Sequence, residues 1–169
     1  MKRDAFDPIE LRQSQAANLT LRAHSLLLQK LESYGNGVSP QHAYALRQLL
    51  SGLTDQGLQI NRGRIAYALP CGAGKTLSVV TWIAAQHQLG LNLSIAVSAQ
   101  QITSLCDIKT ALIDLGVPEN LIGIRYARSS KARWPDTGDE DRPIMLGTHS
   151  RIRGAVDSSV KLSQIPVGY

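Results

Sequence analysis

The segment Ala68–Val80, with the sequence ALPCGAGKTLSVV, contains residue types that can hold a phosphate group. Gly72 and Gly74 lack a Cβ, so the backbone there can curl and turn successive N–H groups toward one anion. A helix that begins near Lys75 would add the partial positive charge of its N-terminus. The Lys75 ammonium can reach the β- and γ-phosphates of a nucleotide, and the Thr76 hydroxyl can ligate Mg²⁺. These residues predict a site for ATP and Mg²⁺.

Their spacing fits the second half of the phosphate-binding pattern G-x-x-x-x-G-K-[ST], in which Leu69 occupies the first glycine position. The other interpretation is a glycine turn that a lysine happens to follow. The surroundings of the loop favour phosphate binding, because an apolar strand pattern precedes it and a helical pattern follows it.

The elements around the loop alternate. We expect strands at 64–69 (RIAYAL), 93–97 (LSIAV), 121–127 (LIGIRYA) and 143–148 (PIMLGT), and helices at 75–86 and 100–116, the latter closed by Gly116 and Pro118. The continuous apolar run at 93–97 is typical of a buried parallel strand. This order predicts an α/β fold, a parallel sheet with flanking helices. The loop would lie after the first strand, the ligand position of open α/β folds.

Two further helices are predicted before the sheet. Apolar residues recur at three- and four-residue spacing from Pro8 to Tyr34, and a second stripe follows Ser39, a predicted N-cap, and ends at Gly57. We therefore divide the chain into a helical N-terminal extension, 1–60, and an α/β part, 61–169.

Composition sets broad limits. The 169 residues are 43% hydrophobic and 18% charged, with a net charge of +5, which is ordinary for a globular domain and compatible with a polyanionic partner. The two cysteines suggest no disulfide framework. No apolar run reaches the length of a membrane span and the N-terminus lacks a signal peptide. We therefore expect a cytoplasmic protein without membrane contact.

At the loop, LPCGAGKT resembles motif I of superfamily 2 helicases and translocases, above all the transcription and repair DNA helicases, in which Leu-Pro-Cys opens the loop. SPQHAYALRQLLSGL is similar to the helix upstream of motif I, with Gln41 at the position of a frequent glutamine. SIAVSAQQITSLC resembles the motif Ia region, with Ser98-Ala99 in place of the usual Pro-Thr. PIMLGTHSRI resembles motif Ib, where Thr148 would face the nucleic-acid backbone.

The resemblance implies an incomplete RecA-like P-loop NTPase domain that binds ATP, Mg²⁺ and nucleic acid, with DNA favoured over RNA. The remainder of a helicase motor is a possible protein partner. The implied nucleotide-binding residues are Gln41, Pro70, Cys71, Gly72, Ala73, Gly74, Lys75 and Thr76, with Thr76 holding Mg²⁺ through the nucleotide. The implied nucleic-acid residues are Thr148, Arg151 and Arg153.

One expected motif is missing. A superfamily 2 motor has a D-E-x-[HD] strand end soon after motif Ib, but here AVDSSVKLSQIPVGY follows, with Asp157 as its sole acid. The acids of GDEDR (138–142) read as a solvated loop, and we expect this chain to lack the second RecA-like domain with its arginine finger. We assign no catalytic residue and expect the chain to be the N-terminal part of a helicase motor that binds Mg-ATP with negligible hydrolysis.

Alternatives remain. The chain could be another P-loop NTPase or phosphotransferase, or a non-catalytic interaction module with a vestigial nucleotide pocket. The basic run from Arg125 to Arg133 beside Trp134 is either a phosphate-tracking surface with one stacking platform or a solvated loop neutralised by its acids, and we favour the loop.

Overall fold

The computed structural model describes residues 8–35, 37–61, 65–126, 133–137 and 142–149. These residues divide into two compact units, one ending at Gly90 and the other beginning at Leu91. The first unit therefore includes the helix that follows the glycine loop. The division predicted at residue 60 stays a prediction, because these units are defined by packing alone.

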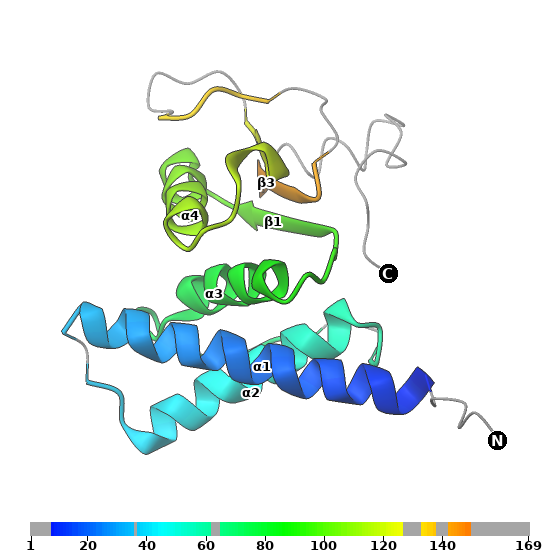
Figure 1. The fold of residues 1–169 in the computed structure, drawn as a ribbon. Helices are drawn as coiled ribbons and strands as arrows, with labels where there is room; N and C mark the ends of the chain where they lie inside the picture. Colours follow the sequence, from blue (N-terminus) through cyan, green and yellow to red (C-terminus); the bar gives the residue numbers. More distant parts are fainter. Residues whose placement is uncertain (1–7, 36, 62–64, 127–132, 138–141, 150–169) are drawn as a thin grey trace. The chain divides into compact units, whose positions relative to one another are not determined.

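Three helices build the first unit: α1 (Pro8–Ser33), α2 (Pro40–Gly57) and α3 (Lys75–Gln88), each packed against the other two (Figure 1). All three predicted helices are confirmed within a few residues. Ser39 caps α2 as expected, since its hydroxyl accepts a hydrogen bond from the His42 N–H at 3.2 Å and Pro40 follows at the first helical position. Fully buried side chains from all three helices form the core: Leu19, Leu27, Leu46, Leu50 and Ile83.

One buried hydroxyl connects the three helices. Thr54 of α2 is fully buried, and its Oγ1 accepts hydrogen bonds from Trp82 Nε1 of α3 at 3.0 Å and from Thr20 Oγ1 of α1 at 3.1 Å. The Thr54 hydroxyl itself donates to the Leu50 carbonyl at 2.8 Å. The cluster thus avoids the penalty of a buried polar group without a partner. It fixes the position of α3, and so of the loop at its start, against both N-terminal helices.

The segment before the loop differs from its prediction. The sequence predicts a strand at 64–69, but Ile65–Leu69 is irregular and belongs to none of the three strands of the sheet, so this prediction is wrong for the described residues. A strand needs a neighbour that pairs its N–H and C=O groups. Here the segment is held by Tyr67, whose hydroxyl donates to the Gln48 carbonyl of α2 at 3.3 Å. The Tyr67 ring occupies the place where a side chain on Gly52 of α2 would begin.

The second unit contains a parallel sheet in the order β1 (Ile95–Ala99), β3 (Ile144–Thr148), β2 (Ile122–Arg125). Ile95 and Ile122 both lie opposite Ile144 in the register. Helix α4 (Ile102–Asp114) packs on all three strands, and a short 3₁₀ helix, Glu119–Leu121, leads into β2. The chain leaves α4 through Gly116, as predicted. The α/β class with a parallel sheet is thereby confirmed.

Strand β1 is less buried than its apolar sequence predicts. Its residues alternate between half-buried and exposed, whereas β3 is buried throughout. Edge position alone does not produce the difference, because β2 is also an edge strand of the described sheet and three of its four residues are buried. None of the described helices is long and apolar enough to cross a membrane.

Candidate functional site

The chain from Pro70 makes a tight turn into α3. Gly72 and Gly74 have φ values of 79° and 86°, a left-handed backbone that other residues adopt only with strain. Gly74 is the N-cap of α3 without a side-chain cap, and the first helical hydrogen bond joins the Ser78 N–H to the Gly74 carbonyl at 2.8 Å. The N–H groups of the first turn therefore have no helical acceptor. The predicted glycine turn and the helix after it are confirmed, and phosphate binding at this turn stays a prediction.

The two glycines have different surroundings. A Cβ on Gly74 would lie 3.7 Å from Leu46 Cδ2 and 3.9 Å from Leu31 Cδ2, so the loop packs on the C-terminal part of α1 and on α2. Ala73 is buried beside it. A Cβ on Gly72, in contrast, would meet no atom within 4 Å. The loop thus has one face on the helical core and an open side at Gly72 where an anion has room.

Lys75 is exposed and folds back over the start of the loop. Its Nζ donates hydrogen bonds to the Leu69 carbonyl at 2.5 Å and to the Pro70 carbonyl at 3.1 Å. Both acceptors are neutral, so phosphate oxygens, which make stronger charge-assisted hydrogen bonds, can replace them. The ammonium is thereby held at the loop without an ion pair to any described carboxylate.

His42 connects α2 to the same loop. Its half-buried ring places Nε2 3.0 Å from the Ala73 carbonyl oxygen. A carbonyl only accepts, so Nε2 carries the hydrogen. His42 is not among the site residues predicted from the sequence, because its contact joins it to a residue 31 positions away. The available signal was the position of His42, just after the capped start of a helix that resembles the one upstream of motif I.

The other predicted nucleotide-binding residues lie on the surface around this turn. Gln41 is exposed beside His42, at the second position of α2. Pro70 and Cys71 are exposed, and the Cys71 thiol is free. Thr76 is exposed in the first turn of α3. Within the described ranges, no group of three His, Cys, Asp or Glu side chains could hold a metal ion.

The predicted nucleic-acid residues are only partly described. Thr148 is the last residue of β3, opposite Ala99, and is 7% exposed. Its hydroxyl is therefore not on the open surface in this structure. Arg151, Arg153 and the acid Asp157 lie outside the described residues, as do residues 138–141 of the acidic loop. A nucleic-acid contact at 148–153 stays a prediction.

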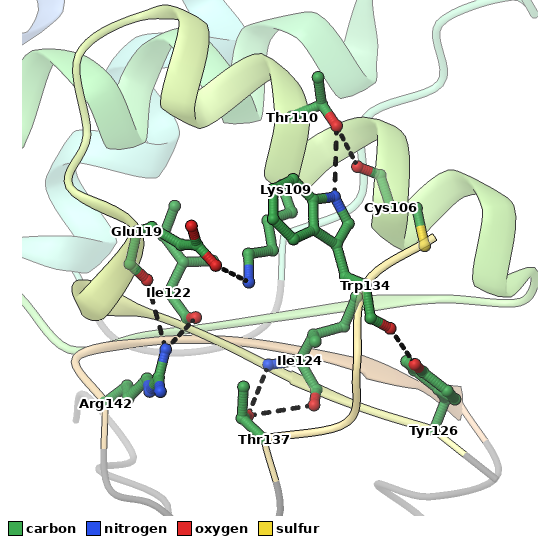
Figure 2. A network of polar contacts seen from close by, with 10 residues as sticks. All are labelled: Cys106, Lys109, Thr110, Glu119, Ile122, Ile124, Tyr126, Trp134, Thr137 and Arg142. Carbon is green, nitrogen blue, oxygen red and sulfur yellow. Dashed lines mark hydrogen bonds and ion pairs between the residues drawn. The ribbon is translucent and has the colours of Figure 1, made fainter. Parts of the chain in front are cut away.

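Trp134 takes part in a network on α4 (Figure 2). Its ring lies over the buried Lys109, with the Lys109 Nζ 4.3 Å from the ring centroid, and its Nε1 donates to Thr110 Oγ1 at 3.3 Å. The same Nζ lies 3.3 Å from Glu119 Oε1. One face of the half-buried indole is therefore occupied by a lysine of the same unit, and the alternative of a stacking platform gains no support. Lys109 follows Leu105 by four residues and precedes Leu112 by three, so it lies on the buried stripe of α4.

The segment 134–137 is fastened to β2 as well. The Tyr126 hydroxyl donates to the Trp134 carbonyl, and Asp136 Oδ2 accepts from the Tyr126 N–H at 3.1 Å. Thr137 Oγ1 accepts from the Ile124 N–H at 2.9 Å (Figure 2). Burial raises the pKa of the Tyr126 hydroxyl, with smaller contributions from Cys106 and Asp136. These contacts fasten residues 134–137 beside β2, while Pro135 and Asp136 stay exposed. The favoured interpretation of the basic run as a solvated loop stays a prediction, because residues 127–132 lie outside the described residues.

The site therefore rests on one loop, its lysine and the start of α3, which together can bind an anion. No protein-family model, curated protein or solved structure matches the chain.

Proposed function

We propose that the chain binds the phosphates of ATP at the loop from Leu69 to Thr76, as the N-terminal part of a superfamily 2 DNA helicase or translocase. The observation that carries the proposal is the position of Lys75, whose ammonium lies on two loop carbonyls at the start of α3. The left-handed glycines and the unpaired N–H groups of the first helical turn support it.

In this proposal each loop residue has a separate task. The Lys75 ammonium leaves the Leu69 and Pro70 carbonyls for phosphate oxygens, and the first-turn N–H groups of α3 donate to the same anion. Thr76 would hold the Mg²⁺ that accompanies the nucleotide, and the ion would neutralise charge on the phosphates. The exposed Gln41 contacts the part of the nucleotide that extends beyond the phosphates. Nucleic acid binds along Arg151 and Arg153, which follow the buried Thr148 in the sequence.

A ligand series tests the phosphate site. Calorimetric titration of the wild-type chain with Mg-ATP, Mg-ADP, pyrophosphate and adenosine separates binding through phosphates from binding through the base. We expect binding of the three phosphate compounds and none of adenosine alone. Binding of adenosine equal to that of Mg-ATP, or no binding of any phosphate compound, would contradict the proposal.

A further inference from the structure

Ala73 lies between Gly72 and Gly74, which both have positive φ, and the Ala73–Gly74 peptide is the point where the loop enters α3. Rotating this peptide unit by half a turn changes ψ of Ala73 and φ of Gly74. Glycine populates both signs of φ, so the backbone itself presents little resistance to that rotation. Another contact must select the orientation.

His42 supplies that contact from a different element. Its Nε2–H donates to the Ala73 carbonyl at 3.0 Å, and the ring is held half-buried in the first turn of α2, where the Ser39 cap fixes the backbone. No described peptide bond is cis. In a trans peptide the C=O and the N–H point in opposite directions. With the Ala73 carbonyl bound to His42, the Gly74 N–H must point away from that ring.

We propose that His42 is a positioning residue that holds the Ala73–Gly74 peptide in one orientation and thereby presents the Gly74 N–H on the side of the loop opposite α2. The effect on a bound ligand rests on the phosphate-binding function proposed above. The orientation of the peptide in the ligand-free protein does not.

Substitutions with matched geometry test the hydrogen bond. In glutamine, Nε2 lies four bonds from Cα, as it does in histidine, so His42→Gln keeps a donor at the same reach. His42→Asn shortens the reach by one bond, and His42→Ala removes the donor. His87→Ala, at the other end of α3, removes a half-buried histidine ring far from the loop and serves as the control.

The first measurement is made without ligand. Nuclear magnetic resonance of the isotope-labelled protein reports the Gly74 amide and the Ala73 carbonyl carbon. We expect both signals to shift in His42→Ala and His42→Asn, to return toward wild type in His42→Gln, and to stay unchanged in His87→Ala. Unshifted signals in His42→Ala would overturn the proposal, and thermal unfolding checks that each variant is folded.

The second measurement is the dissociation constant for pyrophosphate and Mg-ADP. We expect His42→Ala and His42→Asn to weaken binding about two- to tenfold, the range of one neutral hydrogen bond, and His42→Gln to restore it. Weakening without rescue by His42→Gln would assign the effect to ring packing and overturn the proposal. If the wild type binds neither ligand, the proposed function fails, while the ligand-free signals still decide the role of His42.

Discussion

Replacing Lys75 by alanine tests the candidate site most directly. In the ligand-free protein, Lys75 Nζ donates to the Leu69 and Pro70 carbonyls at 2.5 and 3.1 Å. On phosphate binding these neutral acceptors are exchanged for charged ones. Hydrogen bonds to charged groups contribute about 1.5–3 kcal/mol, which corresponds to about 10- to 150-fold in the dissociation constant. Because two carbonyl contacts are given up, we expect a loss near the lower end, about tenfold or somewhat more.

The assay is calorimetric titration of Mg-ATP at low and moderate salt. Arg12→Ala is the matched control, since it removes one exposed positive charge at the start of α1. Arg12 lies about 28 Å along the helix axis from Leu31, the α1 residue nearest Gly74, at 1.5 Å per residue. If Lys75 acted only through general electrostatic attraction, both variants would bind Mg-ATP more weakly, and this loss of affinity would fade with salt. Equal affinities for wild type and Lys75→Ala would refute the reasoning, because the ammonium would then make no contact with the phosphates.

Three further predictions concern other parts of the chain. Thr54→Val should lower the free energy of unfolding by about 1–3 kcal/mol, because the buried Trp82 indole N–H loses its acceptor. Thr54→Ser keeps the hydroxyl and should stay near wild type. Denaturant unfolding measures both variants, and an unchanged stability of Thr54→Val would contradict the role of the hydroxyl. Tyr126 has a raised pKa in the folded state, so its contribution to stability is fully present below about pH 10 and is lost as the pH rises through that raised pKa. In an absorbance titration of the folded protein, Tyr126→Phe should remove the ionisation at the highest pH, and an unaltered curve would contradict this. Replacing Arg151 and Arg153 by alanine should flatten the dependence of log K on log salt for DNA binding by up to about two phosphate contacts; an unchanged slope would exclude them from the nucleic-acid track.

Local patterns in the sequence determined the helices and the glycine turn at the start of α3. The leucine spacing of α1 and the Ser39-Pro40 cap of α2 concern residues three or four positions apart, and helices form from interactions over that distance. The same reason applies to the turn with Gly72, Gly74 and Lys75. A left-handed turn and the helix start after it depend on residues that are neighbours in the sequence.

Only the tertiary structure decided which distant segments meet. The apolar alternation of residues 64–69 predicts a strand, but a strand exists only where another strand pairs with it. The described part of this segment is held instead by the Tyr67 hydroxyl, which donates to the Gln48 carbonyl of α2. The contact of His42 with Ala73 joins residues far apart in the sequence, and the burial of Lys109 depends on Glu119 and Trp134 from other segments. No local pattern encodes these pairs, because each becomes favourable only after packing has brought its partners within hydrogen-bonding distance.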